Sequence, residues 1–170
     1  MQEGTIVVYT DGSKLEDGST GCGWAIYSTT GGRERLVTDG CCYLGKKAEV
    51  VDAELHAVHE GLMALRAMDA PKSKSYICID NTSAITNLRD NDQNAQYARQ
   101  SLAVANELAG GGWEILTLWN PSHCNVVGNE KADEMAKRGA MGEEEMGESF
   151  YACTTKNWML VEAKRTLYRK

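Results

Sequence analysis

The stretch TIVVYTDGS, residues 5–13, decides how the rest of the chain is interpreted. Its four consecutive apolar or aromatic residues, 6–9, are typical of a β-strand that is buried on both faces. The Gly-Ser pair that follows them indicates a turn. Asp11 stands between strand and turn, where a carboxylate is costly unless something pairs with it. Because Asp-Gly is also a common turn pair, Asp11 taken alone is explained as a turn residue.

Length, composition and charge limit the class of protein. The chain has 170 residues, 42% hydrophobic and 25% charged, as expected of one soluble globular domain. No apolar run could span a bilayer and no signal peptide is visible, so we expect an intracellular protein, cytoplasmic or nuclear, without a membrane partner. Six cysteines without a CxxC pair favour free, buried thiols. The net charge of −6 means that any binding of nucleic acid needs a local basic patch or bound cations.

The order of the predicted elements indicates an α/β fold. Short turns between the first three strands imply an antiparallel meander, whereas a helix before the fourth strand implies parallel pairing. The pattern predicts strands within residues 5–13, 22–28, 34–44, 76–80 and 113–119, and helices over residues 48–68, 81–88, 94–109, 129–138 and 155–168. This order predicts a mixed sheet with helices on its faces. We expect residues 1–142 to form the main domain, and residues 143–170 to be an acidic linker and a C-terminal helix appended to it.

Three further acids repeat the anomaly of Asp11. Glu54 falls on the apolar stripe of its predicted helix, Asp80 ends an apolar strand, and Asp133 lies in the first turn of a predicted helix. Each has an ordinary explanation alone, because the helix dipole favours an acid at a helix start and Asp is a common N-cap. Together they favour one shared site near the sheet. Four converging carboxylates would repel one another unless hard divalent ions such as Mg²⁺ or Mn²⁺ neutralised them.

Four motifs, YTDGS, DAELHAV, ICIDN and WNPSHCNVVGNEKADEMAK, resemble in order and spacing the type 1 ribonuclease H family. The resemblance covers residues 5–139. The last motif and the tail TTKNWMLVEAKRTLYRK are most similar to the ribonuclease H domains of non-LTR retrotransposon reverse transcriptases. The resemblance implies the ribonuclease H-like fold, with a five-stranded mixed sheet in the order 3-2-1-4-5. It also implies an endonuclease that uses two Mg²⁺ ions, or Mn²⁺ as a substitute, to hydrolyse the RNA strand of RNA–DNA hybrids.

The resemblance also implies roles for individual residues. The catalytic metal ligands that it implies are Asp11, Glu54, Asp80 and Asp133. It further implies that His123 assists proton transfer or product release. We expect contacts to the 2′-hydroxyls of the RNA strand from Gly12, Ser13 and Asn81. The partners implied are the hybrid itself and a reverse transcriptase in a longer polyprotein, and the chain is expected to be a monomer.

Two features depart from the pattern of the family. Glu49 stands five residues before Glu54, where members often carry a Thr that helps to hold a phosphate, and its charge should repel phosphate. The segment 94–109 has Arg99 as its only cation and lacks the basic protrusion of many cellular members. An alternative therefore stays open, namely a domesticated or weakly active domain that acts mainly as a protein-interaction module.

Two weaker signals favour ordinary explanations. His56 and His59 are spaced i, i+3 on the polar face of their predicted helix, so both are expected to be solvated. Cys124 follows His123 directly, but it lacks the CxxC spacing that is typical of zinc sites. Neither signal alone predicts a metal site.

Overall fold

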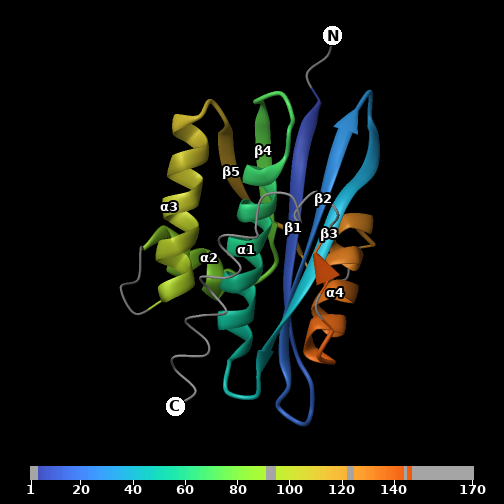
Figure 1. Cartoon of the computed structure of the whole chain (residues 1–170), viewed down its shortest axis with the longest axis vertical. Helices are drawn as coiled ribbons and strands as arrows, with labels where there is room; N and C mark the ends of the chain where they lie inside the picture. The colour runs from blue at the N-terminus through green and yellow to red at the C-terminus, as the bar shows by residue number, and fades with distance from the viewer. Residues whose placement is uncertain (1–3, 91–94, 122–124, 144, 147–170) are drawn as a thin grey trace.

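A computed structural model describes residues 4–90, 95–121, 125–143 and 145–146. These residues form a single mixed sheet with helices on both of its faces (Figure 1). The strands are β1 (Thr5–Lys14), β2 (Thr20–Thr30), β3 (Arg33–Gly45), β4 (Lys74–Ile79), β5 (Glu114–Trp119) and β6 (Glu145–Met146). The helices are α1 (Val50–Ala67), α2 (Thr82–Arg89), α3 (Gln96–Gly110) and α4 (Val127–Ala140). None of these helices is long and apolar enough to cross a membrane.

The strand order in the sheet is β5-β4-β1-β2-β3-β6. β1, β2 and β3 form an antiparallel meander, β4 lies parallel to β1, and β5 lies parallel to β4. The predicted α/β architecture with the order 3-2-1-4-5 is therefore confirmed. The two-residue strand β6 adds to it by pairing with Gly40 and Cys41 of β3. It lies in the segment that was predicted as a linker, and the predicted helix over residues 155–168 lies outside the described residues.

Both faces of the central strand β1 are covered, which explains its continuous apolar run. On one face α1 packs on β1 and β2, and α3 packs beside α1 (Figure 1). Val8 belongs to the large core cluster on this side, together with Trp24 and Ile26 of β2. On the other face α4 covers β1, β2 and β3, and Tyr9 belongs to a smaller cluster that includes Ala132 of α4. Alternate residues of one strand therefore supply two separate cores.

Helix α4 lies directly against the backbone of β2. A Cβ atom at Gly21 would lie 2.0 Å from the backbone N of Ala140, and one at Gly23 would lie 2.1 Å from that of Ala136. Only glycine on the strand, facing small residues on the helix, permits such an approach. The sequence of β2 therefore determines how closely α4 can lie to the sheet.

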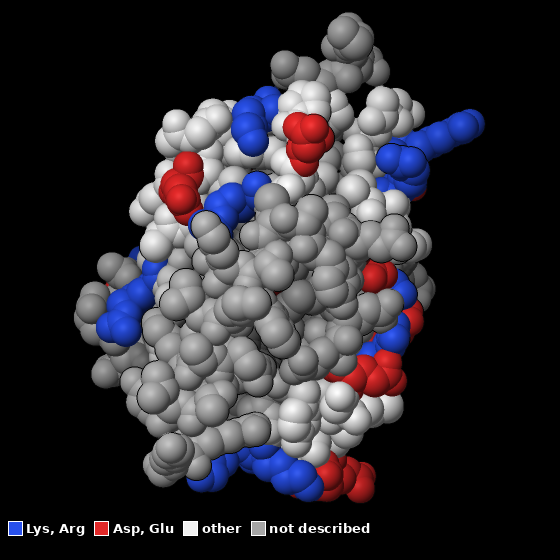
Figure 2. Space-filling model, viewed as in Figure 1, with Lys and Arg blue, Asp and Glu red and all other residues white. Residues whose placement is uncertain are grey.

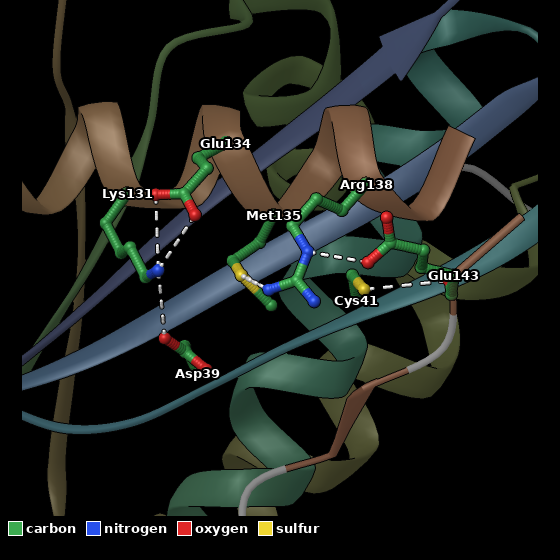
Figure 3. A network of polar contacts seen from close by, with 7 residues as sticks. All are labelled: Asp39, Cys41, Lys131, Glu134, Met135, Arg138 and Glu143. Carbon is green, nitrogen blue, oxygen red and sulfur yellow. Dashed lines mark hydrogen bonds and ion pairs between the residues drawn. The ribbon is translucent and has the colours of Figure 1, made fainter. Parts of the chain in front are cut away.

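Polar contacts link α4, β3 and Glu143, which follows α4 in the chain (Figure 3). Lys131 pairs with Asp39 of β3 at 3.5 Å, and Arg138 pairs with Glu143 at 2.7 Å. The Cys41 thiol of β3 donates to the backbone oxygen of Glu143 at 3.6 Å. Partly exposed ion pairs add little free energy, so their effect is mainly to orient the helix that carries the fourth acid.

The structure corrects the predicted start of α4. Asn129 was expected to be its N-cap, but the helix begins at Val127 with Val126 as N-cap, and Asn129 is buried inside the first turn. The helix also continues past Gly139 to Ala140. Gly128 in the first turn lies against Tyr9 of β1, and Ala140 lies against Gly21 of β2, so tertiary packing overrides the local capping signal.

The prediction of solvated histidines on α1 is wrong for His56. Its side chain is 5% exposed, and its ring stacks on the ring of Tyr97 from α3 with the centroids 4.1 Å apart. His59 is half-buried, and burial lowers its pKa. The polar face of α1 was assigned to solvent because the packing of α3 across it is a long-range contact. The four cysteines within the described ranges, Cys22, Cys41, Cys42 and Cys78, are free and buried as predicted.

Candidate active site

Three of the four predicted acids meet at the end of the sheet towards which the parallel strands β1 and β4 run. This end of the strands is called the acidic edge below. One carboxylate oxygen from each of Asp11, Glu54 and Asp80 lies within 4.8 Å of the other two. Tyr9 of β1 pairs in parallel with Cys78 of β4, so Asp11 and Asp80, each two residues further along the chain, reach the same edge. Glu54 comes from α1, which crosses this part of β1. The constellation is therefore built from three elements that are distant in sequence.

Gly12 allows α1 to bring Glu54 to this edge. A Cβ atom at position 12 would lie 2.7 Å from the backbone N of Glu54 and 2.8 Å from the Cβ of Ala53. The backbone N–H of Gly12 donates to Oδ1 of Asp11 at 2.8 Å and also interacts with the Glu54 carboxylate. Gly12 thus has a structural role between two acids, and its predicted contact with substrate stays a prediction.

The ordinary explanations for these acids do not hold in the structure. Asn81, and not Asp80, is the N-cap of α2, and its Oδ1 accepts from the backbone N of Ala84 at 3.0 Å. The acid in the first turn of α1 is Asp52, whereas Glu54 lies deeper in the helix and is 3% exposed. Since neither Asp80 nor Glu54 serves its helix end, the favoured explanation is a shared site.

Asp133 approaches the site from α4, on the opposite side of the sheet. Its carboxyl group hydrogen-bonds to that of Asp11 when one of the two is protonated, and it pairs with Lys137 one helical turn away. Because α4 begins at Val127, Asp133 lies beyond the first turn, and the prediction that it belongs to that turn is wrong. It stands beside the group of three and is not part of the close triad. Lys137 was not predicted to contribute here, although its i, i+4 spacing from Asp133 is the sequence signal for such a pair.

Burial and mutual repulsion make this site poor at holding negative charge by itself. Burial, and then the charges of Asp80 and Asp133, raise the pKa of Asp11 to about 7. Burial, and then Asp11 and Asp80, raise the pKa of Glu54 to about 10. The Oε2 atom of Glu54 is buried without a hydrogen-bond partner among the described residues. Oxygen donors of this kind fit a hard divalent cation, which would stabilise the ionised forms.

The other predicted site residues lie nearby or outside the described residues. Ser13 follows Gly12 in β1 and pairs with Gly21 of β2. His123 falls within residues 122–124, which the structure does not describe, so its catalytic role stays a prediction. Trp119, at the end of β5, is 59% exposed, and its indole N–H donates to the backbone oxygen of Asp80 at 3.2 Å. An aromatic side chain is therefore exposed to solvent beside the acidic edge.

The raised pKa values predict that, without metal, this site destabilises the protein as the pH rises. The folded state binds these protons more tightly than the unfolded chain, whose pKa values are about 3.8 for Asp11 and about 4.5 for Glu54. The stabilisation that comes from keeping these two acids protonated is therefore complete below the unfolded-state pKa values. It is lost as the pH rises through about 7 for Asp11 and towards about 10 for Glu54. We expect the free energy of unfolding in chelator to fall between about pH 5 and about pH 9.

Chemical denaturation of the wild type and of Glu54→Gln at both pH values measures this effect. The variant should show a shallower decrease, because it lacks the acid with the larger shift. Saturating Mg²⁺ should flatten the decrease for the wild type. Equal slopes for wild type and variant in chelator would contradict the assignment of the effect to this site.

The fold and the acidic edge define an α/β protein with a carboxylate centre suited to divalent cations. The RNase H family model matches residues 3–141, so the chain belongs to the RNase H family. A search of curated proteins found no match.

Solved structures of RNase H enzymes share the fold. RNase H1 from the halophilic archaeon Halobacterium salinarum NRC-1 is 23% identical, with 82% of this chain and 100% of that chain covered and a TM-score of 0.62. LC11-RNase H1 in complex with an RNA/DNA hybrid is 16% identical, covers 78% of this chain and 97% of its own, and has a TM-score of 0.58. Prototype foamy virus protease-reverse transcriptase is 20% identical over 81% of this chain and 21% of its own, with a TM-score of 0.57.

Proposed function

We propose that the chain is a metal-dependent endonuclease that hydrolyses the RNA strand of RNA–DNA hybrids. The observation that carries this proposal is the convergence of Asp11, Glu54 and Asp80 within 4.8 Å, in a member of the RNase H family. The hybrid bound to LC11-RNase H1 supports the choice of substrate. Recognition of RNA would rest on its 2′-hydroxyls, which DNA lacks.

Asp11, Glu54, Asp80 and Asp133 would hold two Mg²⁺ ions, for which Mn²⁺ could substitute. Such ions, when bound, supply a nucleophilic water and stabilise charge on the attacking and leaving oxygens. The ligands would come from both sides of the sheet. Three carboxylates form the close triad, and Asp133 would approach the ions from α4. Lys137 pairs with Asp133 and restricts its orientation. We assign proton transfer or product release to His123.

Substrate contacts are assigned to the rim of the acidic edge. Gly12, Ser13 and Asn81 flank the metal-binding acids in sequence and are proposed to contact the RNA strand. Trp119 adds an exposed indole next to Asp80, where an aromatic ring can stack on a base or a sugar.

The coloured residues on the face seen in Figure 2 supply little general attraction for nucleic acid. Figure 2 shows Lys and Arg side chains interspersed with Asp and Glu around the visible rim, and no large basic patch among the residues it colours. Glu49 pairs with Lys14 at 3.0 Å, and Glu49 is 70% exposed in this pair. This pair neutralises a lysine close to Gly12 and Ser13, where it could otherwise contact a phosphate.

Replacing Glu49 with Thr is expected to tighten binding of the hybrid. The change removes a repulsive charge and releases Lys14 from its ion pair. Glu49 is the N-cap of α1. Because Thr is also a good N-cap residue, the start of the helix should be kept in the variant. KM should fall more than kcat rises, because phosphate contacts mainly position the substrate. The gain should shrink at high salt, which screens exposed charges.

Steady-state kinetics at low and high salt test this expectation. Glu107→Thr is a suitable control, because Glu107 also forms an exposed ion pair, with Arg66, on a different part of the fold. An unchanged or raised KM for Glu49→Thr at low salt would show that Glu49 points away from the substrate.

Cleavage of hybrids labelled on one strand tests the proposed function. With Mg²⁺ the protein should cleave the RNA strand and leave the DNA strand intact, and chelator should stop the reaction. A DNA duplex of the same sequence should not be cleaved. Absence of RNA cleavage with both Mg²⁺ and Mn²⁺, in protein shown to be folded, would refute the proposal and favour an interaction module.

The cellular setting follows as part of the same proposal. The domain acts as a monomer, attached to a reverse transcriptase in a longer polyprotein, in the cytoplasm or nucleus. The similarity to the foamy virus protease-reverse transcriptase and the free, buried cysteines support this setting. Size-exclusion chromatography with light scattering measures the oligomeric state.

A further inference from the structure

A second cluster of potential metal ligands lies beneath α1 and neighbours the acidic edge, since Cys22 lies opposite Gly12 in the β1–β2 pair. The sulfur atoms of Cys22 and Cys42 and one ring nitrogen of His56 all lie within 4.8 Å of one another. All three residues are buried. They come from β2, β3 and α1, so the cluster joins three elements of the fold.

The sheet register brings the two cysteines together. Cys22 lies directly opposite Cys42 in the antiparallel pair of β2 and β3, so both side chains project to the same face. They pack there against Ala53 and Ala57 of α1. Leu44 packs against the same group of residues. The sequence gives no sign of this pairing, because twenty residues separate the cysteines.

His56 has a polar atom that the described protein does not satisfy. Its Nε2 contacts Oε1 of Glu60 at 3.2 Å, whereas its Nδ1 is buried without a hydrogen-bond partner among the described residues. A buried polar atom left without a partner costs about 1–3 kcal/mol. When Nε2 carries the proton and donates it to Glu60, Nδ1 keeps a free lone pair. A histidine oriented by a carboxylate in this way is the usual arrangement around protein-bound zinc.

We propose that Cys22, Cys42 and His56 bind one Zn²⁺ ion. In tetrahedral coordination, with water as the fourth ligand, the three protein donor atoms would lie about 3.5–3.8 Å apart, so donors within 4.8 Å of one another need to approach by about 1.3 Å at most. Binding releases one proton from each thiol to solvent, and the two thiolates then balance the charge of the ion. A neutral complex suits this buried position.

The chemistry of this cluster separates it from the acidic edge. Thiolate and imidazole ligands prefer zinc, whereas carboxylates prefer Mg²⁺ and Mn²⁺. The hydrogen bond with Cys42, followed by burial, raises the pKa of the Cys22 thiol well above its usual range. A bound ion would connect β2 and β3 to α1, the helix that also carries Glu54. The inferred role is therefore to fix α1, and the inference does not depend on the proposed nuclease activity.

Titration of the reduced full-length chain with Co²⁺ tests the proposal. Excess Mg²⁺ occupies the carboxylates, and Co²⁺ bound by thiolates produces a charge-transfer absorption that Co²⁺ bound by carboxylates does not. We expect this absorption to saturate at one Co²⁺ per chain and to disappear when Zn²⁺ displaces it. Zn²⁺ should also raise the melting temperature, since it binds the folded state.

Matched variants locate the ion. Cys22→Ser and Cys42→Ser should each abolish the charge-transfer absorption, and Glu60→Gln should weaken Co²⁺ binding about 10–100-fold. Cys41→Ser is the control, because Cys41 is adjacent to Cys42 in β3 but its sulfur contacts Glu143 beside α4. This variant should keep both the absorption and the shift in melting temperature.

Two results would overturn the inference. One is the absence of charge-transfer absorption in the wild type, which does not depend on how well any variant folds. The other is its persistence in the Cys22→Ser, Cys42→Ser double variant. Circular dichroism of each variant without metal establishes that a lost signal reflects a lost ligand and not an unfolded chain.

Discussion

Asp80→Asn is expected to abolish cleavage of RNA–DNA hybrids and to raise the melting temperature of the metal-free protein. Asp80 is one of three acids whose oxygens lie within 4.8 Å, so its loss removes a ligand of the proposed metal site. Its charge also raises the pKa values of both Asp11 and Glu54. Removing that charge relieves repulsion that only a cation would otherwise offset. Loss of activity together with a gain in stability distinguishes a metal ligand from a structural residue.

Hybrid cleavage in Mg²⁺ and thermal unfolding in chelator measure the two effects on the same protein sample. Activity should fall to the level of the wild type in chelator. Asp69→Asn is the control, because Asp69 is an exposed acid beyond the end of α1 and should leave both measurements unchanged. Wild-type cleavage by Asp80→Asn, or a lower melting temperature than that of the wild type, would contradict the assignment.

Gly23→Ala is expected to be strongly destabilising, although it adds only one methyl group. The added Cβ would lie 2.1 Å from the backbone N of Ala136 and 2.5 Å from the backbone oxygen of Ala132. Both atoms belong to the backbone of α4, which cannot give way as a flexible side chain can. Overpacking of this kind costs about 1–3 kcal/mol or more. Such a cost would lower the melting temperature by about 2–4 °C for each kcal/mol.

The same substitution should also reduce hybrid cleavage, because α4 carries Asp133 to the acidic edge. Gly110→Ala is the matched control, since a Cβ at Gly110 meets no atom within 4 Å. Differential scanning calorimetry and the cleavage assay compare the two variants. Equal melting temperatures for Gly23→Ala and Gly110→Ala would show that α4 does not lie against β2 as described.

Short-range patterns in the sequence predicted most of the elements of the sheet. The apolar run at the start of β1 predicted a strand buried on both faces, and the structure places a separate core on each side of it. The position of Glu54 on an apolar stripe predicted burial, and its side chain is 3% exposed. The two-residue strand β6 could not be predicted, because it exists only by pairing with β3.

Helix ends and capping residues were predicted less well. The signal at Asn129 was misleading, because α4 gains its first turn from packing on the sheet and not from a cap. Asn81 caps α2 through its side-chain oxygen, and its expected contact with RNA stays a prediction. A side chain that can serve either a helix end or a ligand is assigned by its neighbours in space, which the sequence does not reveal.

The sequence by itself determined the mixed α/β fold and which four acids are unusual, because apolar periodicity and chain order are local properties. Only the tertiary structure decided which groups meet. It brings Asp11, Glu54 and Asp80 into one triad and leaves Asp133 beside it. It also joins Cys22, Cys42 and His56 beneath a helix face that the sequence assigned to solvent. Both outcomes depend on strand register and on the packing of helices against the sheet, and these contacts link residues that are far apart in the chain.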